Sequence, residues 1–146
     1  MAIDRQGTGL AVVRVLVGVF FLFEGLNKWR WLFNASILAG QLSGWQAASP
    51  AGALNVRYLS GIALPGVWLF ARLVPAGEIA CGLALIFGVW TTLAALVAFL
   101  MALNFQFASG ALVKYSFLTS GYGLPVLGST LGLAIGGVRL PWSIRG

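Results

Sequence analysis

A few charged and amide side chains lie inside stretches of the chain that are otherwise apolar, and these are the residues best placed to do chemistry. They are Arg14, Glu24, Glu78, Asn104 and Gln106. A charge at the centre of a bilayer costs about 2–3 kcal/mol, so such residues usually face the protein interior. A carboxyl group as deep as that of Glu78 favours its protonated form unless a cation reaches it. A protonatable carboxyl in this position is suited to a quinone head group or to a proton step.

Depth along the expected helices indicates which of these groups could meet. At ~1.5 Å per residue, Glu78 lies between Arg14 and Glu24 in depth and close to Asn104. Lys28 follows Glu24 by one turn, in the order that favours an ion pair. We therefore expect one connected polar centre, formed by Arg14, Glu24, Glu78 and Asn104, with Lys28 at its outer edge. The alternative is that these residues only pair with one another and hold the bundle together.

The composition around these residues is that of an integral membrane protein. Of the 146 residues, 60% are hydrophobic and 8% are charged, whereas soluble domains carry about 25% charge. So few charged side chains cannot cover a water-facing surface, which excludes a soluble enzyme. Intrinsic disorder is also excluded, because it needs low hydrophobicity. The length is that of one domain, over residues 1–146.

The net charge of +6 does not indicate a nucleic-acid partner, because the basic residues are scattered singly along the chain. Membrane topology and anionic lipid head groups explain them better. With no histidine and one cysteine, Cys81, the chain alone cannot ligate a haem or chlorophyll through histidine or supply a zinc or iron–sulfur ligand set. We expect no metal and no covalent cofactor. A bound quinone or lipid stays open.

Four apolar stretches predict transmembrane helices over residues 9–26, 73–89, 92–108 and 124–138. The apolar run over 73–107 would be ~50 Å long as one helix, too long for a hydrocarbon core of ~30 Å. It must fold back, and the Gly-Val-Trp-Thr-Thr sequence at 88–92 is the expected hairpin. The first stretch has no A-x-A cleavage site, so we interpret it as a retained span.

The segment over residues 32–72 is more polar, and its apolar pieces are too short to span. It predicts short helices at the membrane interface between spans one and two. Pro75 either starts the second span or kinks it. The expected fold is therefore an all-α integral membrane protein, a four-transmembrane-helix bundle with short interfacial helices between the first two spans.

Small residues recur at every fourth position in three of the predicted spans, which lets helices approach closely in lipid. They are Ala80, Ala84 and Gly88 in the second span, Ala94, Ala98 and Ala102 in the third, and Gly128, Gly132 and Gly136 in the fourth. Either all these stripes pack within the bundle, or the glycine stripe of the fourth span packs against a helix of another subunit.

Three stretches resemble the DoxX and DoxD-type membrane protein family. The first span has R-x-x-x-G-x-x-F-L-F-E-G-x-N-K from Arg14, and the second has V-P-x-G-E-x-x-x-G-L-x-L-x-x-G from Val74. The ending G-G-V-R-x-x-x-S from Gly136 is similar to the family's C-terminal signature. The long first loop and Asn104 are closer to the DoxD branch, the small subunit of thiosulfate:quinone oxidoreductase. The chain departs from the family at the hairpin, where Thr91 and Thr92 replace a frequent Arg. It departs again at Glu24, where relatives often have His.

The resemblance implies a small integral membrane subunit of a larger respiratory or photosynthetic, quinone-linked electron-transfer complex, mainly structural or close to a quinone or lipid. The alternative is a DoxD-type small subunit that takes direct part in quinone reduction. A third class, a transporter or lipid-binding protein acting alone, lacks the inverted repeat expected of transporters. Redox catalysis by this chain alone is disfavoured, because it has no metal ligands and only one cysteine.

The expected partners follow from this class. They are other membrane-protein subunits and the lipid bilayer, and not nucleic acid. The expected location is the inner membrane of a prokaryotic cell, crossed several times. An even number of spans puts both termini on one side, which we expect to be cytoplasmic. The charges of the loops do not decide this orientation.

Overall fold

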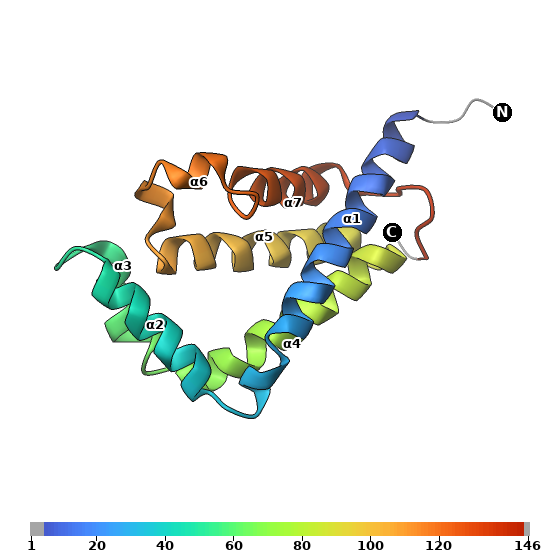
Figure 1. Cartoon of the computed structure of the whole chain (residues 1–146). Helices are drawn as coiled ribbons and strands as arrows, with labels where there is room; N and C mark the ends of the chain where they lie inside the picture. The colour runs from blue at the N-terminus through green and yellow to red at the C-terminus, as the bar shows by residue number, and fades with distance from the viewer. Residues whose placement is uncertain (1–4, 145–146) are drawn as a thin grey trace.

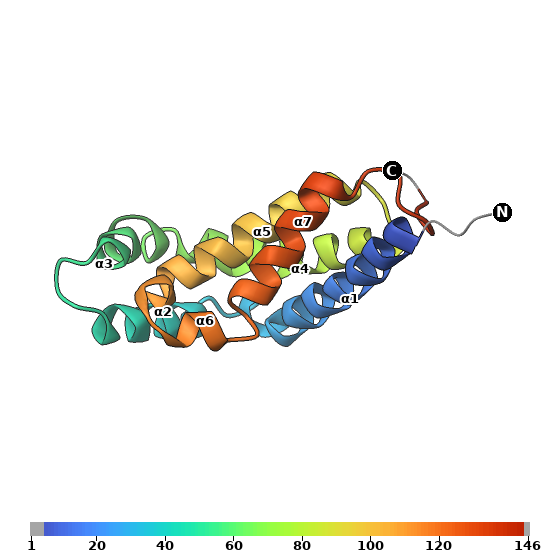
Figure 2. The same ribbon diagram turned by 90° about the horizontal axis from the view of Figure 1, so that it is seen from above.

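The computed structural model describes residues 5–144, and all the regular structure in this range is helical. Its long helices are α1 (Arg5–Asn27), α4 (Val67–Phe87) and α5 (Thr91–Ala108), and its shorter ones are α2 (Ser36–Ala48), α3 (Leu54–Tyr58), α6 (Ser116–Thr119) and α7 (Leu124–Gly136). Single turns at Trp29–Leu32, Leu59–Ala63 and Ala111–Val113 connect them. Helix α1 packs along α4, and α7 packs along α5 (Figures 1 and 2).

In the described part of the chain, α1, α4 and α5 are long and apolar enough to cross a membrane. The predicted fourth span over 124–138 is not confirmed. Helix α7 has 13 residues, or ~20 Å, against a hydrocarbon core of ~30 Å. It ends at Gly136, and Arg139 then takes a φ of +56°, which a right-handed helix cannot accommodate.

The hairpin predicted at residues 88–92 is confirmed. Helix α4 ends at Phe87 and α5 begins at Thr91. Between them Gly88 has a φ of +66° and Trp90 a φ of +46°. Gly88 is needed there for two reasons. Its φ is left-handed, and a Cβ at this position would collide with the Arg14 and Ser143 side chains.

Glycines set the register of α1 against α4. A Cβ added to Gly82 of α4 would lie 2.5 Å from the backbone nitrogen of Leu22, and one added to Gly25 of α1 would lie 2.9 Å from the carbonyl oxygen of Pro75. Only hydrogen atoms fit at these positions, so the two backbones are in direct contact. The helices run antiparallel, and this register brings the turn containing Glu24 level with Glu78.

The segment between the first two long helices contains short helices, as predicted, but it ends earlier than residue 72. Residues 67–72 already belong to α4, and the buried Pro75 lies inside that helix. Helices α2 and α3 form the end of the molecule remote from the hairpin (Figures 1 and 2). Their apolar side chains, among them Leu38 and Leu42, share one core with Trp31 and Phe105.

The beginning of α1 and the segment that follows α7 lie together at the opposite end of the molecule (Figure 1). The backbone N–H of Ile144 donates to the Phe87 carbonyl oxygen at 3.1 Å. The termini themselves lie outside the described residues. The described chain therefore starts and finishes at the same end of the bundle.

Candidate functional site

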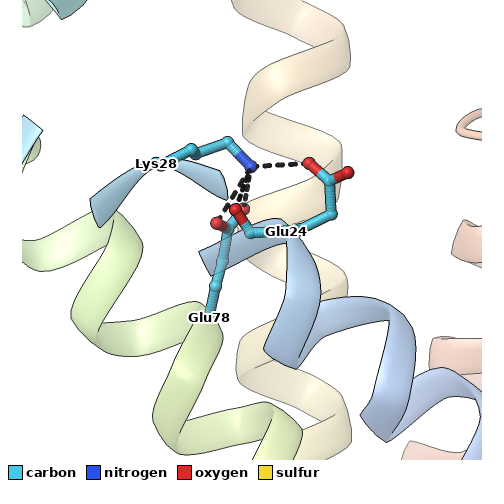
Figure 3. A network of polar contacts seen from close by, with 3 residues as sticks. All are labelled: Glu24, Lys28 and Glu78. Carbon is cyan, nitrogen blue, oxygen red and sulfur yellow. Dashed lines mark hydrogen bonds and ion pairs between the residues drawn. The ribbon is translucent and has the colours of Figure 1, made fainter. Parts of the chain in front are cut away.

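Two carboxylates converge on a single lysine where α1 meets α4 (Figure 3). The Lys28 Nζ donates to Glu24 Oε2 at 2.7 Å, and to Glu78 Oε1 and Oε2 at 3.1 and 3.0 Å. It also donates to the Glu24 carbonyl oxygen at 3.2 Å. We call Glu24, Lys28 and Glu78 the charged triad. Lys28 reaches Glu78 because α1 ends at Asn27, just before it.

The charged triad is shielded from solvent and holds more negative than positive charge. The Glu78 side chain is 6% exposed and that of Lys28 is 12% exposed. With all three groups ionised the triad carries one excess negative charge, so a single proton or one further hydrogen-bond donor would balance it. Lys28 is therefore the cation that reaches Glu78, so the Glu78 carboxylate is part of an ion pair and is not isolated. Removing one member of such a buried pair typically costs 3–5 kcal/mol.

Aromatic rings surround the lysine. Its Nζ lies 5.5 Å from the ring centroid of Phe105 and 6.0 Å from that of Trp31, within the range of cation–π attraction. The Phe105 ring is nearly parallel to Trp31 and meets Trp45 edge-on at 5.8 Å. The turn Trp29–Leu32 and helix α5 thus carry the rings that flank the ammonium group, and Trp45 of α2 packs against one of them.

A cavity of about 230 Å³ opens beside the charged triad. Its other polar lining comes from Gln41 of α2, from Gln106 of α5, from Ser109, which follows α5, and from Tyr122, which precedes α7. Gln106 Nε2 donates to the Tyr122 carbonyl oxygen at 2.8 Å, which connects α5 to the loop before α7. Phe20, Phe21 and Trp45 complete an aromatic wall. The cavity thus combines charged hydrogen-bonding groups with flat apolar surfaces.

Arg14 is not part of this centre, although the sequence placed it there. It is fully buried at the hairpin end, where Nη1 donates to Ser143 Oγ and Nη2 donates to the Trp142 carbonyl oxygen at 2.9 Å. The glycine-set register puts Arg14 beside Gly88, about ten residues along α4 from Glu78 at ~1.5 Å each. Arg14 therefore secures the C-terminal segment.

Asn104 also lies outside the charged triad. Its side chain is exposed, and its Oδ1 accepts a hydrogen bond from the Tyr58 hydroxyl at 2.8 Å. Depth along a helix gives the height of a residue but not its direction around the axis. The prediction of one connected polar centre is thus wrong for Arg14 and Asn104, while Glu24, Lys28 and Glu78 do meet.

Several residues of the site had no sequence signal. Gln41 and Trp45 belong to a segment whose sequence is typical of an interfacial helix. Phe105 is one of many apolar residues in a predicted span, so its sequence context does not distinguish it. Gln106 did have a signal, because it is an amide inside an apolar run, and it lines the cavity. Only the folding of α2 over α5 assembles these residues around Lys28.

The small-residue stripes divide into two kinds. Ala94 and Ala98 of α5 are buried in the bundle. The three glycines of α7, by contrast, are exposed. A Cβ added to Gly128 or Gly132 would meet no atom within 4 Å, and one added to Gly136 would meet only Leu10 Cδ1, at 3.7 Å. Within the described residues the glycine stripe therefore faces outward.

The described residues do not gather into a cluster of metal ligands. Over residues 5–144, no group of three or more His, Cys, Asp or Glu side chains could hold a metal ion. Cys81 is a buried free thiol in α4. The charged triad and its cavity are therefore the candidate site that the described structure offers.

Comparison with known proteins identifies the family. The DoxX family model matches residues 9–111, which is well over half of the chain and includes the whole charged triad. No curated protein and no solved structure matches the sequence. With its three candidate membrane-spanning helices, the chain therefore belongs to the DoxX family of membrane proteins.

Proposed function

We propose that this protein is a small membrane subunit of a larger respiratory or photosynthetic, quinone-linked electron-transfer complex. In this proposal the cavity beside Lys28 receives the head group of a quinone. The observation that carries it is the meeting of Glu24 and Glu78 on Lys28 at the wall of a cavity of about 230 Å³. Ionisable groups inside a membrane protein are by default candidates for a functional site.

The residues present suit such a head group. Lys28 has three N–H donors and could turn one of them to a carbonyl oxygen in the cavity while Glu24 and Glu78 hold the other two. Phe21, Trp45 and Phe105 provide flat surfaces for a ring. The volume is below the ~300 Å³ at which pockets for drug-sized ligands begin, so the cavity suits a head group without its tail. A bound quinone would supply two-electron, two-proton redox chemistry.

Direct participation in quinone reduction, as in a DoxD-type subunit, is the second candidate. It is supported by the proton-carrying groups at the cavity wall. Conversion of a quinone to a hydroquinone takes up two electrons and two protons. The electrons would come from a partner subunit. The Lys28 ammonium would hold one proton next to the reacting oxygen, and the Glu78 carboxylate would take up the second proton and pass it on.

The glycine stripe on α7 supports assembly with a further membrane subunit. Its three members face outward, and the helix offers a flat backbone surface there. In lipid, close backbone approach is a main source of helix–helix attraction. We propose that a helix of a partner subunit packs on Gly128, Gly132 and Gly136, in the inner membrane of a prokaryotic cell. Both termini would be cytoplasmic, which agrees with the two described ends of the chain lying together.

The binding proposal is tested with duroquinone, a quinone without a tail, on protein purified in mild detergent. Equilibrium dialysis should show binding by the unaltered protein and at least a tenfold loss in Lys28→Met, since one hydrogen bond to a charged group is worth about 1.5–3 kcal/mol. Lys114→Met is the matched control, because Lys114 is exposed and lines none of the cavities described.

A variant with the same net charge as the ionised triad guards against simple misfolding. Lys28→Met combined with Glu78→Gln removes the more buried of the two stranded carboxylates and should fold, yet it should still bind duroquinone weakly. If the unaltered protein does not bind duroquinone, or if the double variant binds it as well as the unaltered protein, the proposed quinone site is wrong.

A further inference from the structure

The polar cavity adjoins a second hollow, and that hollow adjoins a groove on the surface of the bundle. A narrow space of about 30 Å³ shares Trp45 and Phe105 with the cavity. An open groove of about 370 Å³ between α4 and α5 shares Phe70, Val74, Asn104 and Phe105 with the narrow space. The Phe105 ring borders all three hollows. The narrow space and the Phe105 ring therefore separate the groove from the Lys28 cavity.

The groove is apolar and faces the surroundings of the bundle. Leu73 and Leu100, which line it, are 55% and 54% exposed. Gly77 deepens it, because a Cβ there would come within 3.2 Å of Met101 Sδ. Helices α4 and α5 diverge from their hairpin (Figure 1), and residues of these two helices line the groove. Since both helices are candidate membrane spans, the groove opens toward lipid.

One polar group interrupts this apolar surface. Asn104 lies in α5 and its side chain is exposed at the inner end of the groove. Its Oδ1 accepts from the Tyr58 hydroxyl, while no acceptor within residues 5–144 receives a hydrogen bond from its Nδ2. The Nδ2 donor is thus exposed beside the groove, where a ligand in the groove could accept from it. A ligand with a carbonyl oxygen and an apolar body would satisfy both the amide and the groove.

We infer that the α4–α5 groove holds the hydrocarbon tail of a membrane-dissolved quinone whose head group enters the Lys28 cavity between α4 and α5, passing the Asn104 amide. This inference rests on the proposed function and adds the route and the tail site. The head-group cavity is too small for a long tail, so the tail must leave it. The groove offers an exit with apolar lining. The narrow space holds little more than a water molecule, so the Phe105 ring must turn aside for the ligand to pass.

The tail site is tested by narrowing the groove without touching the head-group cavity. Leu73→Trp adds a large ring at a position that lines the groove but neither of the inner hollows. Binding of decylubiquinone, which has a ten-carbon tail, should weaken about tenfold or more, because an overfilled site excludes the chain. Binding of duroquinone, which has no tail, should be unchanged. Leu83→Trp on the same helix is the control, since Leu83 is exposed and lines none of the hollows.

The outcomes separate the two proposals. If Leu73→Trp weakens both quinones equally, or weakens neither, the groove does not hold the tail, and the head-group site stands. If Leu83→Trp weakens decylubiquinone as much as Leu73→Trp does, the effect is not specific to the groove, and the inference is wrong. If the unaltered protein binds neither quinone, the proposed function fails, and the tail site fails with it.

Discussion

Replacing Lys28 with methionine should be among the most destabilising single changes in this protein. Methionine nearly keeps the length of the lysine chain and its contacts with Trp31 and Phe105, so the variant removes mainly the charge. Two carboxylates then face each other across the α1–α4 contact without a cation. Glu78, with a side chain 6% exposed, keeps little contact with bulk solvent and has no second cation among its side-chain partners within residues 5–144.

The magnitude follows from the burial of the partners. Breaking a fully buried ion pair by removing one partner costs about 3–5 kcal/mol. Glu24 is 24% exposed and can recover part of its hydration, so we expect the lower end of that range, about 3 kcal/mol. Removing the stranded charge as well should restore much of this loss. Glu78→Gln in the Lys28→Met background should therefore be more stable than Lys28→Met alone, by about 1–2 kcal/mol.

The free energy of unfolding is measured for each variant by titration with a denaturing detergent in mixed micelles, followed by circular dichroism. Lys114→Met serves as the control for loss of a lysine at an exposed position and should change stability by less than about 0.5 kcal/mol. The four proteins of the Lys28–Glu78 cycle give the coupling between the two residues. A loss below about 1 kcal/mol in Lys28→Met, or a coupling near zero, would refute the view that Lys28 neutralises Glu78.

Four further substitutions test the packing of the helices. Gly82→Ala should destabilise the protein by about 1–3 kcal/mol, because its Cβ would lie 2.5 Å from the Leu22 backbone. Gly128→Ala should be neutral or stabilising by up to about 1 kcal/mol, since space is open there. If detergent unfolding shows the same loss of stability in Gly82→Ala and Gly128→Ala, the assigned register of α1 against α4 is wrong. Gly132→Leu should leave unfolding unchanged but weaken association with partner subunits in mild-detergent purification, and a folding defect would instead place the glycine stripe inside the bundle. Arg14→Met should release the C-terminal segment, seen as faster hydrogen exchange of the Ile144 amide, and unaltered exchange would show that Arg14 does not hold this segment.

Local features of the sequence were enough to predict the membrane helices, the hairpin and one ion pair. The low charge and the long apolar runs predict membrane helices without reference to any tertiary contact. The hairpin at residues 88–92 could be found because a helix of ~50 Å does not fit a bilayer. The Glu24–Lys28 pair follows from their spacing of four residues on one helix. Each of these depends on neighbours in the chain, and each is present in the structure.

Only the tertiary structure decided which polar groups meet. Glu78 joins Lys28 because Gly82 and Gly25 set one register between α1 and α4. That register is fixed by backbone contacts between residues fifty or more positions apart. The same register carries Arg14 away to the hairpin. The rotation of α5 about its axis turns Asn104 to the surface and Phe105 toward the lysine. Sequence periodicity gives the height of a residue in the membrane, while helix packing sets the direction that it faces.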